Sequence, residues 1–167
     1  MDRTFNVLFL CTGNSARSIM AEAILARAGK GRFKAYSAGS HPSGTLHPYA
    51  ISQLGEAGCE LDNLRSKSWE EFSRLDAPAM DFVITVCDNA AGEVCPVWPG
   101  HPISAHWGFA DPAAFNGTPD EKAAAFHKVF REILSRINIF VSLPLHMLEK
   151  NAIKRELDKI GAGSMDI

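Results

Sequence analysis

Short apolar runs recur along the chain and predict its β-strands. Residues 6–10 and 81–86 are rich in Val, Ile, Leu and Phe, and residues 33–37 form a third run. Runs of this length, bounded by loop-forming residues, indicate buried strands. The first run ends directly before Cys11, and the last ends directly before Cys87.

Five segments carry helical signals. Ser18 precedes a run of good helix formers and is a candidate N-cap. The sequence Thr-Pro-Asp-Glu at 118–121 is typical of a capped helix start. Pro144 ends the helix that begins there, and the apolar positions that follow predict a further helix that packs on the domain or meets a partner. We expect helices over residues 18–26, 47–54, 68–75, 118–140 and 145–160.

The alternation of these elements predicts an α/β domain with a parallel sheet. Ligands bind at the carboxyl edge of such sheets, and we expect Cys11 and Cys87 to emerge together at that edge. Between residues 88 and 119, glycines and prolines recur and no regular element is predicted. Loops of this length in a compact domain are usually either functional or disordered.

Composition narrows the class of protein. A chain of 167 residues fits one domain, and its net charge of −2 gives no basic surface for nucleic acid or for a membrane. No apolar stretch approaches the roughly 20 residues needed to span a bilayer. We therefore expect a cytoplasmic protein. In a reducing compartment its four cysteines are more often catalytic, metal-binding or inert than paired in structural disulfides.

The segment after the first predicted strand has the features of an anion-binding loop. Backbone N–H groups in a loop of small residues before a helix can converge on a tetrahedral oxyanion, and the helix N-terminus adds positive potential. Gly13 allows close approach, and Asn14 tolerates a left-handed conformation. The predicted oxyanion-binding residues are Thr12, Gly13, Asn14, Ser15, Ala16, Arg17 and Ser18.

Two side chains of this segment favour chemistry at Cys11. Arg17 has a planar guanidinium that can bind two oxygens of one anion. The positive environment is expected to lower the pKa of the Cys11 thiol, and the Ser18 hydroxyl is expected to hydrogen-bond the thiolate. The alternative is a strand-end cysteine beside a surface arginine.

The chain resembles the low-molecular-weight tyrosine phosphatase superfamily over about residues 5–140. The resemblance is carried by the loop from Cys11 to Ser18 and by the tripeptides Met20-Ala21-Glu22 and Ser37-Ala38-Gly39. It implies an α/β domain of three layers, with a small parallel sheet of about four strands flanked by helices. We expect residues 1–142 to form the phosphatase-like domain and residues 143–167 to be a helical extension of the same domain.

The same resemblance implies roles for three side chains. Cys11 would be the nucleophile, Arg17 would bind the oxyanion, and Asp111 would donate a proton. Asp111 is followed by Pro112, as in the general-acid motif of the superfamily. An ordinary turn residue before proline is the other interpretation of Asp111.

Two further segments resemble the thioredoxin-coupled arsenate reductases of this superfamily. Residues 86–96 contain Cys87 and Cys95, and residues 106–113 contain the Asp-Pro pair. Ala113 stands after that pair, where tyrosine phosphatases usually carry a Tyr that holds the substrate ring. A small side chain at this position suits a compact inorganic anion.

The second resemblance implies reduction of arsenate through a disulfide relay among Cys11, Cys87 and Cys95. It implies thioredoxin or a glutaredoxin-type protein as the reductant, and no metal or other cofactor. A tyrosine phosphatase needs only Cys11, Arg17 and Asp111, and a non-catalytic sensor of thiols or anions is a third possibility. Inert roles for Cys87 and Cys95 remain open, as does a zinc site that includes His101 and His106, although the spacing of the cysteines is wider than usual.

Lys67 departs from the family pattern. Some reductases of the superfamily bind a potassium ion behind the anion loop, and Asn14, Glu22 and Ser37 match that site. Lys67 stands where an acidic ligand is expected. Either its ammonium takes the place of the cation, or it is a solvated surface charge. Cys59 has no partner signal, and we expect it to be structural.

Overall fold

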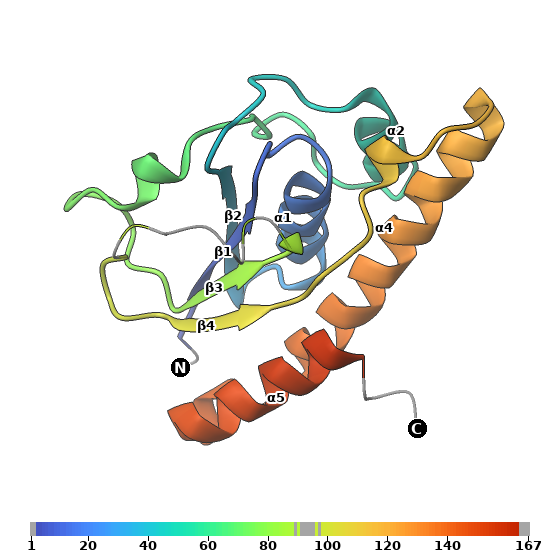
Figure 1. The fold of residues 1–167 in the computed structure, drawn as a ribbon. Helices are drawn as coiled ribbons and strands as arrows, with labels where there is room; N and C mark the ends of the chain where they lie inside the picture. The colour runs from blue at the N-terminus through green and yellow to red at the C-terminus, as the bar shows by residue number, and fades with distance from the viewer. Residues whose placement is uncertain (1–2, 89, 91–95, 97, 164–167) are drawn as a thin grey trace.

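The structure, a computed structural model, describes residues 3–88, 90, 96 and 98–163. Figure 1 shows a small sheet with helices packed beside it. The strands are β1 (Phe5–Cys11), β2 (Phe33–Gly39), β3 (Phe82–Thr85) and β4 (Ile103–His106). The α-helices are α1 (Arg17–Ala28), α2 (Pro48–Glu56), α4 (Pro119–Ser142) and α5 (Lys150–Ala162). Short 3-10 helices are η1 (Trp69–Phe72), η2 (Pro112–Ala114) and η3 (Leu145–Met147).

The sheet confirms the predicted α/β architecture. Its strand order is β2-β1-β3-β4, and every neighbouring pair is parallel. The three predicted strands are present as β1, β2 and β3. The fourth strand, β4, is not predicted, because it lies between residues 88 and 119, where glycines and prolines recur. The C-terminal ends of all four strands lie at one edge, with Cys11 the last residue of β1.

Alternate residues of β1 pack into two cores, one on each face of the sheet. Val7 and Phe9 belong to the larger core, in which α1, α2, α4 and α5 also bury their apolar residues. Leu8 and Leu10 belong to a smaller core on the other face. Within the described residues, Phe72 of η1 and the loop residues Met80 and Trp98 cover that smaller core.

Of the helical features predicted at Ser18, residues 68–75 and Thr118, the structure confirms one and corrects two. Thr118 caps α4 with a complete capping box, as predicted, because its hydroxyl accepts from Glu121 N–H while the Glu121 carboxylate accepts from Thr118 N–H. Ser18 is not the N-cap of α1, because the helix begins at Arg17 and Ser18 lies in its first turn. The predicted short helix at 68–75 is the single 3-10 turn η1, capped by Ser68.

The C-terminal segment packs on the edge of the sheet. Ile153, Leu157 and Ile160 of α5 are buried in the larger core, and Leu157 O accepts a hydrogen bond from the Trp107 indole (3.1 Å). Lys154 Nζ donates to Ser104 O of β4 (2.6 Å). The predicted packing helix is therefore present as α5, which lies beside β4 in Figure 1. It begins at Lys150 and not at residue 145 as predicted, because residues 145–147 form the separate 3-10 helix η3. Within the described residues, no helix has both the length and the apolar character needed to cross a bilayer.

Candidate active site

The loop after β1 is held from outside through its carbonyl groups. Thr12 O accepts from His41 N, Gly13 O from Ser43 N, and Ser15 O from His47 N, each at 2.9 Å. In a trans peptide the C=O of one residue and the N–H of the next point in opposite directions. The N–H groups of residues 13, 14 and 16 therefore point away from the 41–47 segment. These are the donors that the predicted oxyanion cradle requires.

Asn14 is the buried centre of this loop. Its φ of 48° lies in the left-handed region, as expected for an Asn at this position. Its Oδ1 accepts from Lys67 N (2.9 Å). Its Nδ2 donates to Ser18 Oγ (2.8 Å) and to Ser37 Oγ (3.0 Å). Ser18, which was expected to bond the Cys11 thiolate, is thus an acceptor for Asn14 and a support of the loop.

Close backbone approach occurs at Gly39, the last residue of β2. A Cβ atom at this position would collide with Thr12 O and would come within 3.1 Å of the Asn14 side chain. At Gly13, by contrast, a Cβ atom would meet Ser15 Oγ at an ordinary 3.8 Å. The glycine that allows β2 to pack against the loop is therefore Gly39, in the Ser37-Ala38-Gly39 motif.

Arg17 connects the loop to the predicted acid segment. Its side chain is only 15% exposed, and Nη1 donates to Phe109 O (3.0 Å). Its Nη2 lies 3.6 Å from Asp111 Oδ2. Asp111 also caps η2, where its Oδ1 accepts from Ala113 N–H (3.0 Å). The carboxylate is thus both a turn cap, as one interpretation held, and a neighbour of the oxyanion-binding arginine.

The structure brings Cys11 and Cys87 into contact. They are 5% and 2% exposed, and each thiol is the first influence on the pKa of the other. The neighbouring Cys87 thiol and burial raise the pKa of Cys11 above its ordinary value, against the opposing influence of Arg17. The neighbouring Cys11 thiol, aided by the Ala90 N–H, lowers the pKa of Cys87 to about 5. The two thiols therefore titrate as a pair, and the Arg17 charge alone does not lower the pKa of Cys11 as expected.

Two further cysteines, Cys59 and Cys95, occur in the chain. Cys95 lies outside the described residues. Cys59 is buried near Arg27, where burial raises the pKa of its thiol. His101 lies before β4 and lines a hollow together with Arg3 and Asp81, near the start of β1. Within the described part of the chain, no three metal-ligating side chains come together.

His47 borders the site and was not among the predicted site residues. It caps α2, and its Nδ1 accepts from Tyr49 N–H (3.2 Å). Its ring lies 4.5 Å from that of Phe126, and partial burial lowers its pKa, although the Asp111 charge opposes that shift. The helix predicted from residue 47 is present as α2, but nothing in the sequence indicates that its start faces the anion loop.

Comparison with known proteins identifies the class. The family of low molecular weight phosphotyrosine protein phosphatases matches residues 6–157, and the chain belongs to this family. The match includes the cradle, Arg17, Asp111 and both described thiols at the sheet edge.

Particular relatives within this class are arsenate reductases. The arsenate reductase of Bacillus subtilis (strain 168) is 40% identical over 134 residues, which cover 80% of this chain and 93% of that protein. A solved structure of an arsenate reductase in the phosphate binding state has a TM-score of 0.66 and 28% identity, and covers 83% of this chain and 98% of its own. A thioredoxin-dependent arsenate reductase of Corynebacterium glutamicum has a TM-score of 0.55 and 27% identity over 82% of this chain and 63% of that chain.

Proposed function

We propose that this protein reduces arsenate to arsenite through a thiol–disulfide relay that starts at Cys11. The observation that carries the proposal is the pair of neighbouring buried thiols, Cys11 and Cys87, beside an anion cradle. A phosphatase of this family needs one thiol at the cradle, whereas reduction needs a second thiol within reach of the first. The similarity to arsenate reductases supports the same assignment.

The substrate binds first in the cradle. Arsenate is a tetrahedral oxyanion, and its oxygens accept hydrogen bonds from the inward N–H groups of the loop and from the Arg17 guanidinium. For this purpose Arg17 turns its donors from Phe109 O toward the anion. Because Phe109 and Asp111 belong to one segment, this movement also adjusts the position of the acid.

The first covalent step forms a bond between Cys11 Sγ and arsenic. The Cys11 thiolate attacks As(V), and one arsenate oxygen leaves as water after Asp111 donates a proton to it. Arsenic remains As(V) in this adduct. Cys11 must be the thiolate at this stage, and the proton it shares with Cys87 passes to Cys87 or is lost.

The second step carries the electron transfer. Cys87 gives any proton it holds to an oxygen of the departing arsenite, and its thiolate attacks Cys11 Sγ. The electron pair of the S–As bond goes to arsenic, which leaves as As(III) in arsenite. The two cysteine sulfurs are oxidised to a Cys11–Cys87 disulfide. The contact between these thiols places the attacking sulfur next to its target, as the step requires.

The relay ends at Cys95. The Cys95 thiolate attacks Cys87 Sγ, releases the Cys11 thiolate and forms a Cys87–Cys95 disulfide, which an external dithiol reduces. Since Cys87 is 2% exposed, a third cysteine is needed to pass the disulfide on to an external protein. We favour a thioredoxin-type reductant, because the Corynebacterium glutamicum neighbour is thioredoxin-dependent. We place the reaction in the cytoplasm, where such reductants keep thiols reduced.

A coupled assay tests the proposal. Reduced protein is mixed with arsenate, thioredoxin, thioredoxin reductase and NADPH, and NADPH oxidation is followed, with Cys11→Ser as the control. Arsenate-dependent oxidation that the control lacks supports the reductase. If glutaredoxin with glutathione also fails as the donor while aryl phosphate is hydrolysed, the protein is a tyrosine phosphatase and the relay is wrong.

A further inference from the structure

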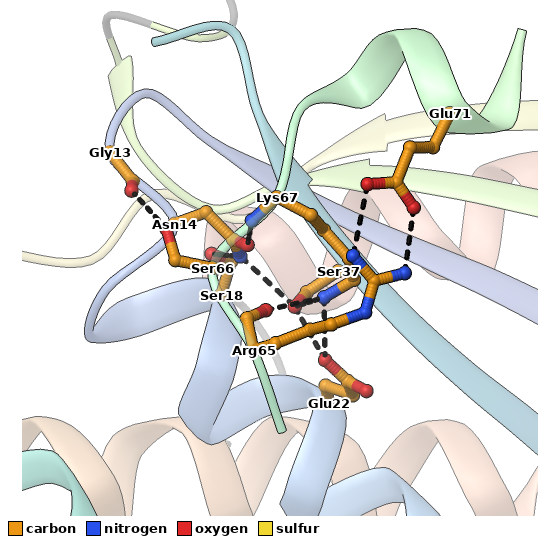
Figure 2. Close-up of polar contacts among 9 residues, drawn as sticks. All are labelled: Gly13, Asn14, Ser18, Glu22, Ser37, Arg65, Ser66, Lys67 and Glu71. Atoms are coloured by element: carbon orange, nitrogen blue, oxygen red, sulfur yellow. Dashed lines mark hydrogen bonds and ion pairs between the residues drawn. The ribbon is translucent and has the colours of Figure 1, made fainter. Parts of the chain in front are cut away.

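A lysine ammonium is buried behind the anion loop. The Lys67 side chain is 5% exposed, and the solvated surface charge considered for it is therefore wrong. Its Nζ donates to Arg65 O (2.7 Å) and to Ser37 Oγ (3.5 Å) and lies 3.6 Å from Glu22 Oε1. Figure 2 shows these oxygens gathered around the ammonium. Lys67 thus occupies an oxygen-lined site of the kind that binds hard cations.

Two short chains of hydrogen bonds connect the Lys67 site to Asn14 in the anion loop. In the first, Ser37 Oγ donates to Glu22 Oε1 (2.5 Å) and accepts from Asn14 Nδ2. In the second, the backbone N–H of Lys67 itself donates to Asn14 Oδ1. Both polar atoms of the Asn14 side-chain amide are therefore held by hydrogen bonds, Nδ2 by Ser37 Oγ and Oδ1 by the Lys67 N–H (Figure 2).

This attachment matters because Asn14 holds a conformation that L residues seldom adopt. A non-glycine residue with positive φ needs compensation from its surroundings. The amide of Asn14 provides it, since it bonds outside the loop at Ser37 and Lys67 and inside α1 at Ser18. Asn14 lies in the middle of the anion loop, and its φ sets the direction of the neighbouring N–H groups.

We propose that Lys67 is a positioning residue whose ammonium serves as a built-in cation, holding the oxyanion cradle in its binding shape without a bound metal ion. The inference rests on the proposed function only in that the cradle binds a tetrahedral oxyanion. Lys67 acts through Glu22, Ser37 and Asn14 and does not touch the substrate.

The charges of the site are balanced within the protein. Burial raises the pKa of Glu22 and lowers the pKa of Lys67, and each charge opposes the shift of the other. Arg65, two residues before Lys67, is also held by a contact outside the site. Its guanidinium binds the Glu71 carboxylate through two hydrogen bonds of 2.7 and 2.9 Å. Figure 2 shows this outer pair next to the inner one. Arg65 O is thereby held where it accepts from Lys67.

Truncation of the lysine gives a specific expectation. Lys67→Ala removes the ammonium but leaves Glu22 Oε1, Ser37 Oγ and Arg65 O facing a vacated space. A small monovalent cation can then replace the lost charge, because carboxylate, hydroxyl and carbonyl oxygens are its preferred ligands. Lys67→Met fills the same space with an apolar side chain and gives no such rescue. Lys34→Ala, at an exposed lysine near the other end of β2, is the matched control.

The test measures phosphate binding, which needs no reduction step. Calorimetry gives the dissociation constant of inorganic phosphate in choline chloride and in potassium chloride of equal ionic strength, at slightly alkaline pH. We expect Lys67→Ala to bind phosphate about tenfold more weakly in choline and to recover in potassium. Wild type and Lys34→Ala should bind equally in both salts. Amide NMR signals of Gly13 and Ser15 should shift in Lys67→Ala and return with potassium.

Three results would overturn the inference. The first is a wild-type affinity that depends on potassium, a measurement that remains available even if the variant does not fold. The second is wild-type affinity in Lys67→Ala without potassium. The third is a loss in Lys67→Ala that potassium does not restore while its melting temperature is unchanged. Failure of the coupled arsenate assay would leave these measurements intact, because they concern the cradle and not the relay.

Discussion

The thiols of Cys11 and Cys87, which are 76 positions apart in the sequence, are neighbours at the carboxyl edge of the sheet. Each thiol changes the pKa of the other, so that the pKa of Cys11 is raised and the pKa of Cys87 is lowered. Movement of one proton between the two sulfurs changes which of them is the thiolate. The same pair can therefore present either sulfur as the nucleophile, and the two covalent steps require this in turn.

Replacing Cys87 should make Cys11 more acidic. In Cys87→Ser the influence of the Cys87 thiol, which raises the pKa of Cys11, is weakened or removed, while Arg17 and the Thr12 N–H continue to lower it. The midpoint of Cys11 thiolate formation should move to lower pH, and iodoacetamide should alkylate Cys11 faster at neutral pH. Cys59→Ser should leave the alkylation profile unchanged. An unaltered profile in Cys87→Ser would show that the pair is not coupled.

Asp111→Asn should slow chemistry and spare binding. The amide oxygen still accepts from Ala113 N–H, so η2 is preserved, but the proton donor is lost. General-acid catalysis typically contributes at least about a hundredfold, and we expect a loss of that size in kcat for arsenate with KM little changed. Steady-state kinetics in the coupled assay measure both constants. A change confined to KM would assign Asp111 to the placement of Arg17 instead.

Gly39→Ala should damage the cradle without altering any catalytic side chain. The added methyl group meets Thr12 O and the Asn14 side chain, so the loop must shift. We expect the free energy of unfolding to fall by about 1–3 kcal/mol and phosphate binding to weaken. Gly55→Ala in α2 is the control, because a Cβ atom there makes only an ordinary contact with Leu61. It should be neutral or stabilising by up to ~1 kcal/mol. Equal phosphate affinity in both variants would count against a fixed loop shape.

Leu157→Ala should destabilise the whole domain. Leu157 is fully buried in the larger core, and its loss leaves a cavity between α5 and the sheet. We expect a cost of about 2–5 kcal/mol in one cooperative denaturant transition. The exposed Arg155→Ala should stay within about 0.5 kcal/mol of wild type. Two separate transitions would argue against our proposal that residues 143–167 extend the same domain.

Much of the fold follows from local pattern. The apolar runs that became β1 and β3 are buried on both faces, and a strand of that kind leaves a continuous signal in the sequence. β4 gives no such signal, because only Ala105 of its four residues is buried and prolines precede it. An edge strand with polar residues and few neighbours cannot be distinguished from a loop by its pattern.

The residues of the site also fall into those that the sequence indicates and those that it does not. Cys11 and Arg17 are recognisable because the chemistry needs those side chains at that spacing. The 41–47 segment leaves no comparable signal, since it holds the anion loop through backbone N–H groups that almost any residue can supply. Lys67 has a distinctive side chain, but its burial depends on Glu22 and Ser37, which approach it only in the folded chain.

The position of α5 has one more consequence, which concerns the behaviour of the protein in concentrated solution. Ile103 N–H donates to Asp81 O, just before β3, and Trp107 N–H donates to Thr85 O of β3. The carbonyl oxygens of Ser104 and His106 therefore point to the side of β4 away from β3. Lys154 binds the first of these oxygens, and Gly161 packs directly against the second. An uncovered strand with such oxygens is a template on which another chain can add a strand and begin to aggregate. Helix α5 therefore protects the protein from aggregation through the β4 edge at high concentration. Deletion of α5 would expose that edge.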